Sequence, residues 1–275
     1  MGLTSAIAWG LGDFGGGMMS RRVPLFGVVA VTQAVGMIAA LIVAVARGEP
    51  VPTGPDLAWA IAAGLCGVVG MSSLYHGLAV GRMGVVAPTT GVVGAVVPVL
   101  FGFATEGVPT PMTVLGIATA LLAVVLVTRA PGHHADRPSG VAWALLAGTA
   151  IGGFNICIGQ FSGAGQFAPL VVLRGVQIVV LLALIVLWRQ PWRMHREDVA
   201  KLSVIGVLDM VGNVAFISAA QVGALAIATI LSSLYPVTTV LLALTLLHER
   251  VTRSHVLGIA LTMLAISLIA IGTTS

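Results

Sequence analysis

The sequence has very little charge and few aromatic residues for its length. Only 8% of its 275 residues are Asp, Glu, Lys or Arg, and only 5% are aromatic, whereas 58% are hydrophobic. Soluble domains carry about 25% charged residues, so this composition excludes a soluble globular protein. Most of the chain consists of apolar stretches of roughly 20 residues, each long enough to cross the hydrocarbon core of a bilayer. We therefore expect an all-α polytopic membrane protein surrounded by lipid.

Several features that indicate other classes of protein are also missing. The net charge is +4, but the basic residues lie in short gaps between apolar runs and form no stripe, so we predict no nucleic-acid partner. No Gly-x-x-x-x-Gly-Lys loop is present, so an ion or solute gradient would have to drive any uphill process. His133 and His134 lie beside Asp136 without the spacing of metal ligands, and we predict neither a metal nor a cofactor. The two cysteines, Cys66 and Cys157, fall inside apolar runs and do not indicate a redox compartment.

The apolar runs, separated by Arg, Pro and Gly, predict ten membrane-spanning helices. The connections between them are short, which leaves no room for a separate soluble domain. The function is therefore expected within the membrane. The predicted spans are residues 3–20, 25–46, 57–79, 84–104, 111–128, 140–158, 168–188, 202–220, 224–246 and 255–272.

The longest polar connection divides the ten spans into two groups of five. It runs from Arg129 to Ser139 and is rich in Pro, His and charged residues. We predict a first five-helix repeat over 1–130, a linker over 131–139 and a second five-helix repeat over 140–275.

The two halves resemble each other in sequence. A shift of 142 residues places 56–128 on 198–270 with seventeen identities in seventy-three positions, among them the run 114–118 against 256–260. Because five is an odd number, two such repeats lie in opposite orientations in the membrane. Inverted repeats are typical of secondary transporters, whose substrate site lies near the midplane between the halves.

The same sequence resembles the EamA-type transporters of the drug/metabolite transporter superfamily. The resemblance rests on Ala-Trp-Gly at 8–10, the repeat of five spans, Ser-Ser-Leu-Tyr-Pro at 232–236, His-Glu-Arg at 248–250 and Leu-Gly at 257–258. It covers essentially the whole chain and implies a ten-helix carrier of the inner or plasma membrane, commonly an exporter of amino acids, other small metabolites or drugs. One departure is Thr-Glu-Gly at 105–107, where the family often has Gly-Glu-Arg.

The positive-inside rule and the family resemblance predict opposite orientations in the membrane. Eleven basic residues lie in the odd-numbered connections and only Arg47 lies in an even-numbered one, which by the positive-inside rule places both termini outside the cell. The family resemblance implies cytoplasmic termini. Both orientations stay open.

Three ionisable residues fall within predicted spans, where charges are costly and are functional candidates by default. Asp13 lies well inside the first span, in a glycine-rich helix that permits close approach of neighbours. Trp9 lies one turn away on the same face and could cover a cavity. Burial makes a carboxylate harder to ionise, so Asp13 would suit binding of a proton or a cationic substrate, or else a structural pairing with Arg174.

The other two charges belong to the second half. Asp209 and Asn213 share a face of the eighth span, and the repeat places Asp209 opposite Gly67. Arg174 and Gln177 lie one turn apart in the seventh span, where the guanidinium could bind a substrate carboxylate bidentately. An Arg174–Asp209 pair that only stabilises the fold is an equal alternative.

Further candidate binding residues are weaker, because polar groups within spans usually bond across helices without a ligand. Tyr235 and Ser232 precede a proline that frees a carbonyl and favours a kink, which would be a gate or a simple bend. The remaining two candidates are Asn155 and His76.

The resulting hypothesis is a secondary active transporter, not an enzyme, that exports a small metabolite or drug by proton coupling or exchange. Asp13, Arg174 and Asp209 could together hold a zwitterion such as an amino acid. We expect the protein to be a monomer or a homodimer. Two alternatives stay open: an intramembrane aspartyl protease, suggested by Gly-Leu-Gly-Asp at 10–13, and a membrane protein that binds without transporting.

Overall fold

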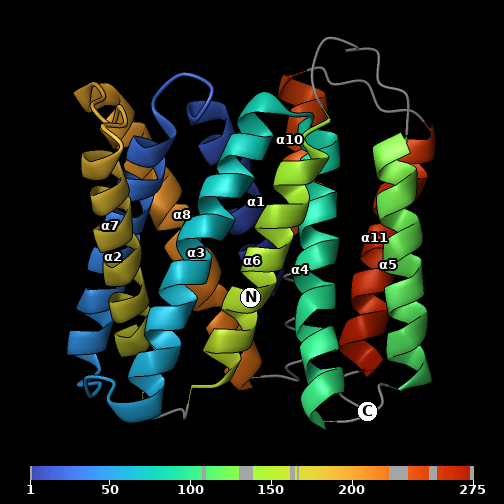
Figure 1. Cartoon of the computed structure of the whole chain (residues 1–275), viewed down its shortest axis with the longest axis horizontal. Coiled ribbons are helices and arrows are strands. Elements are labelled where there is room, and N and C mark those ends of the chain that lie inside the picture. The colour runs from blue at the N-terminus through green and yellow to red at the C-terminus, as the bar shows by residue number, and fades with distance from the viewer. Residues whose placement is uncertain are drawn as a thin grey trace.

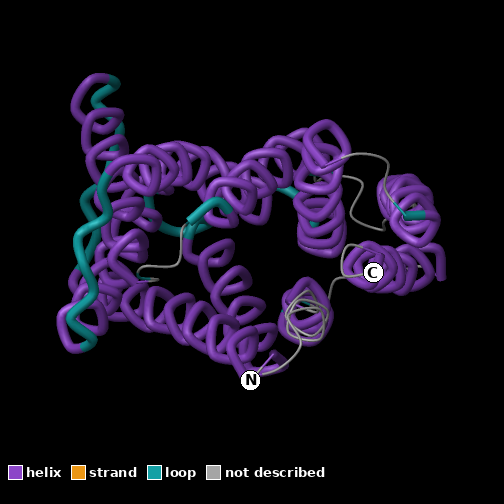
Figure 2. Tube along the Cα trace, turned by 90° about the horizontal axis from the view of Figure 1, so that it is seen from below, coloured by secondary structure: helices purple, strands orange, loops and turns teal. Residues whose placement is uncertain are grey.

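The structure is a computed structural model that describes residues 2–106, 110–129, 139–161, 165, 167–222, 235–247 and 253–272. Every regular element within these residues is a helix (Figures 1 and 2). The helices are α1 (Gly2–Met19), α2 (Leu25–Ala46), α3 (Gly54–Val80), α4 (Met83–Glu106), α5 (Pro111–Arg129), α6 (Val141–Gly159), α7 (Phe167–Leu187), α8 (Arg196–Val222), α10 (Tyr235–Leu246) and α11 (Arg253–Gly272).

The helices correspond closely to the predicted spans. The predicted all-α class is confirmed for the described residues, and α2 has the same bounds as its predicted span, 25–46. The largest difference is α8, which begins six residues before its predicted span because a charged first turn, with Glu197 and Asp198, precedes the apolar stretch. Residues 223–234, which include the first half of the predicted ninth span, lie outside the described residues, and so do 131–138 of the predicted linker.

Five of the described helices are long and apolar enough to cross a bilayer: α2, α3, α4, α6 and α7. Shorter apolar segments lie within α5, α10 and α11. The glycines and Asp13 of α1, and the charged start of α8, lower the hydropathy of those two helices. The outer faces carry large exposed hydrophobic side chains, such as Val45 of α2 (72% exposed) and Val186 of α7 (73%). Exposure of such a surface to water is unfavourable, whereas contact with lipid is favourable.

The contacts between helices follow a two-fold pattern. Exchanging α1 with α6, α2 with α7, α3 with α8, α4 with α10 and α5 with α11 turns the α1–α8 contact into the α3–α6 contact, and α1–α10 into α4–α6. The same exchange turns α2–α8 into α3–α7 and leaves the α2–α7, α4–α10 and α5–α11 pairs unchanged. Figure 1 shows two of these self-equivalent pairs at opposite ends of the molecule, α2 with α7 and α5 with α11.

Candidate functional site

A buried arginine joins three helices in the interior. Arg174 of α7 is 5% exposed, and its Nη2 forms an ion pair with Oδ2 of Asp209 in α8 at 2.6 Å. Its Nη1 donates to Oε1 of Gln33 in α2, also at 2.6 Å. Because Gln33 belongs to the first half of the chain and the other two residues to the second, this network ties the halves together. The Arg174–Asp209 pair that the sequence left as an alternative is therefore present.

Two glycines make room for the polar side chains of α7. A Cβ atom on Gly36 of α2 would lie 2.7 Å from Cζ of Arg174, so the guanidinium rests directly on the α2 backbone. A Cβ on Gly67 of α3 would collide with Nε2 of Gln177, which is 3% exposed. Small residues permit such close approach between membrane helices. Gly67 is the repeat counterpart of Asp209. At this position the first half of the chain leaves space for the side chain of Gln177, whereas the second half carries a carboxylate.

Asp209 accepts hydrogen bonds from two side chains. Besides Arg174, Nδ2 of Asn213 donates to Oδ2 of Asp209 at 3.3 Å and to its backbone oxygen at 2.8 Å. The Asp209 side chain is still 25% accessible. The predicted pairing of Asp209 and Asn213 on one face of α8 is therefore seen, and it leaves part of the carboxylate open.

Asp13 lies near this network without joining it. It interacts electrostatically with Asp209, and it is close enough to Tyr75 and Tyr235 to act on both of their hydroxyl groups. Within the part of the chain that the structure describes, its carboxylate has no ion-pair or hydrogen-bond partner. The predicted alternative of an Asp13–Arg174 pair is not found there. Among the described residues, one carboxylate of the site is thus paired and the other is not.

Aromatic rings line the Asp13 side of the cluster. The rings of Trp9 and Tyr235 pack edge to face, with centroids 6.4 Å apart, and Trp9 also lies against Gly212 of α8. Tyr75 of α3, which is 1% exposed, packs its ring on α1. Tyr75 was not among the residues predicted for the site. A usable signal was present, since the chain has only two tyrosines and both lie near Asp13.

Two of the remaining predicted site residues, His76 and Asn155, are not brought to the cluster. His76 packs against Trp143 of α6 with ring centroids 4.5 Å apart. Asn155 is exposed near the end of α6, and Ser232 lies outside the described residues. The structure therefore groups Asp13, Arg174 and Asp209 with Trp9, Tyr235, Asn213 and Gln177.

Two buried polar atoms of the cluster are unsatisfied. Among the described residues, neither Nε of Arg174 nor Oε1 of Gln177 has a hydrogen-bond partner. An unpaired buried polar group costs about 1–3 kcal/mol, so a donor and an acceptor are available here to a water molecule or a polar ligand. No group of three or more potential metal ligands occurs in the described part of the chain.

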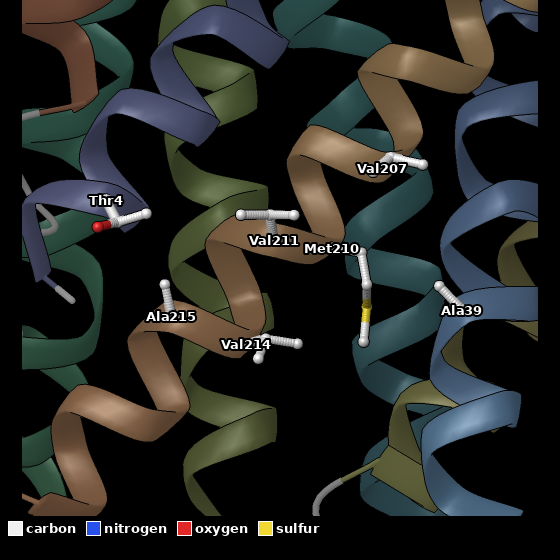
Figure 3. A pocket seen from close by; sticks show the side chains of 7 residues that line it. All are labelled: Thr4, Ala39, Val207, Met210, Val211, Val214 and Ala215. Atoms are coloured by element: carbon white, nitrogen blue, oxygen red, sulfur yellow. The ribbon is translucent and has the colours of Figure 1, made fainter.

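A groove of about 430 Å³ on the outside of α8 is different in character (Figure 3). Its lining is almost wholly apolar and offers nothing to pair with a charge, so we do not place the site there. The groove is lined by Thr4, Ala39, Val207, Met210, Val211, Val214 and Ala215.

Comparison with known proteins gives one family and one fold. The EamA-like transporter family matches the chain over residues 1–129 and 138–271. No curated protein matches the sequence. Among solved structures 23 chains match, and one crystal structure, 15% identical, aligns with a TM-score of 0.67 over 97% of this chain and 94% of its own length. At that identity the likeness establishes a common fold alone.

Proposed function

Because this chain belongs to the EamA-like transporter family, we propose that it is a secondary active exporter of small metabolites or drugs, driven by proton coupling or exchange. The family consists of transporters of the drug/metabolite type, and nothing observed favours a protease. Chemistry with two catalytic carboxylates needs both to share a proton, whereas Asp209 is already paired with Arg174.

We further propose that the chain crosses the plasma membrane ten times, as two inverted repeats of five helices. The two-fold exchange of helix contacts supports this arrangement, since related halves make equivalent contacts. Alternating access then follows from two packings of similar energy, in which the halves exchange their roles.

The observation that carries the proposed mechanism is that the carboxylate of Asp13, beside the Arg174–Asp209 ion pair, has no ion-pair or hydrogen-bond partner among the described residues. Ionised Asp13 and Asp209 together with Arg174 leave one uncompensated negative charge in the interior. A buried charge without a partner is costly, so this position favours a cation: a proton or the ammonium group of a substrate. Competition between the proton and the substrate for Asp13 would couple proton movement to substrate transport.

The ion pair also restricts how an amino acid would bind. Each terminal nitrogen of Arg174 donates one hydrogen bond, to Asp209 or to Gln33, and keeps a second N–H group, while Nε has no partner among the described residues. A substrate carboxylate would therefore bind Nε or a remaining terminal N–H group, or would displace one of the two partners. The ammonium group of the same substrate would pair with Asp13.

The test compares metabolites inside and outside cells that express equal membrane amounts of wild type, Asp13→Asn and Asp209→Asn. We expect a solute exported by the wild type and by the control Glu197→Gln, whose exposed side chain lies at the start of α8, but not by Asp13→Asn. Equal export by all variants would remove Asp13 and Asp209 from the mechanism.

A further inference from the structure

A carboxylate from the first half of the chain caps a helix of the second half. Glu49 lies in the connection between α2 and α3, and its Oε2 accepts hydrogen bonds from the backbone N–H groups of Phe167 (2.7 Å) and Ala168 (2.9 Å). These are the first two residues of α7, whose N–H groups have no partner within their own helix. An anion at this end also interacts favourably with the helix dipole. The contact joins residues 118 and 119 positions apart, across the two halves.

Neighbouring contacts hold the carboxylate in place. The guanidinium carbon of Arg47 lies 5.5 Å from the centre of the Phe167 ring, and Nε of Arg47 is 4.0 Å from Oε1 of Glu49. The Glu49 side chain is only 9% accessible, whereas that of Arg47 is 52% accessible. Gly165, just before α7, packs closely against the carboxylate, since a Cβ there would lie 3.0 Å from Oε2 of Glu49. The side chain of Glu49 is thus nearly inaccessible and is held at the N-terminal end of α7.

At the opposite end of the α2–α7 pair, no such carboxylate is found among the described residues. There the start of α2 meets the connection between α7 and α8: a Cβ on Gly27 would touch the backbone oxygen of Trp192 and the terminal methyl group of Met194. Pro24, the residue before α2, makes no side-chain capping bond. The position 142 residues after Glu49 is Pro191, which has neither a charge nor an N–H group. The two ends are therefore closed by different chemistry.

We propose that Glu49 is a latch that holds the α2–α3 connection on the start of α7 and favours the conformation closed at that end. The α2–α7 pair is equivalent to itself under the two-fold exchange, so its two ends are the same contact made twice by the two halves. A charge-assisted cap at one end only therefore biases an otherwise balanced equilibrium. Loss of a cap changes such an equilibrium by roughly 2- to 30-fold.

The experiment measures the distance between nitroxide spin labels on the two sides of the latch by double electron–electron resonance. The labels replace Thr53 and Gln160, which are exposed and do not belong to the latch, in full-length protein carrying Cys66→Ser and Cys157→Ser. The variants are Glu49→Ala and Glu49→Gln, and the matched control is Glu197→Ala, which removes an exposed carboxylate from the first turn of α8.

We expect Glu49→Ala to increase the ratio of long to short distances by roughly 2- to 30-fold. Glu49→Gln, which keeps an acceptor oxygen but loses the charge, should give a smaller increase, and Glu197→Ala should match the parent. A distance distribution unchanged by Glu49→Ala would overturn the proposal, and so would equal shifts from Glu49→Ala and Glu197→Ala. The nearly isosteric Glu49→Gln provides the same test if the alanine variant does not fold. No substrate is needed, so the outcome is independent of the proposed transport.

Discussion

The two sides of the interior polar cluster use the same kinds of side chain in opposite ways. On the α7–α8 side, Arg174 has a partner on each terminal nitrogen, and Asp209 accepts from two residues. On the α1 side, Asp13 has no such partner among the described residues and faces aromatic rings. A complete ion pair in a low-dielectric interior stabilises one packing of the helices, whereas an unpaired charge is costly and is retained where a ligand neutralises it. The difference assigns stability to one side and binding to the other.

Removal of Arg174 gives the largest expected loss of stability. Arg174→Met leaves the carboxylate of Asp209 and the amide of Gln33 without their charged partner, and breaking a buried ion pair costs about 3–5 kcal/mol. The measurement is the apparent melting temperature of purified protein in detergent. Arg174→Met combined with Asp209→Leu should recover much of the loss, because no buried charge is then left unpaired. A melting temperature unchanged by Arg174→Met would show that the pair contributes nothing to stability.

A methyl group at Gly36 should have an intermediate effect. Gly36→Ala places a Cβ where the guanidinium of Arg174 now lies, so α2 must shift or the hydrogen bond to Gln33 must lengthen. Overpacking of this kind costs about 1–3 kcal/mol. Gly175→Ala is the matched control, since a Cβ there meets only the sulfur of Met37, at an ordinary contact distance of 4.0 Å. If both alanine variants melt at the same temperature, the close contact at Gly36 is not needed.

The positions of the helices could be predicted from the sequence, since the length of an apolar run is set by the thickness of the bilayer. The span 25–46 and helix α2 coincide, and the grouping of Asp209 with Asn213 follows from their spacing on one helix. Neither depends on how the helices are rotated against each other.

Contacts between helices could not be predicted in the same way. Two carboxylates within the predicted spans, those of Asp13 and Asp209, were candidate partners for Arg174. Its pairing with Asp209 depends on how α1, α7 and α8 are rotated about their axes. His76 looked equivalent to other polar residues in spans, yet it faces Trp143. The cap on α7 comes from Glu49, more than a hundred residues earlier, and no local pattern at Phe167 indicates it.

Substitution of Asp13 should have the smallest effect on stability and the largest on transport. Asp13→Asn keeps the shape of the side chain, breaks no ion pair or hydrogen bond described for Asp13, and removes a negative charge that lies near Asp209. Its apparent melting temperature should therefore equal or slightly exceed that of the wild type, while export of the substrate is lost. The same preparation provides a second measurement: a cationic substrate should raise the melting temperature of the wild type, because a ligand stabilises the state that binds it, but not that of Asp13→Asn. A fall in melting temperature as large as that of Arg174→Met would instead make Asp13 a structural residue, and the contrast between the two sides of the cluster would be lost.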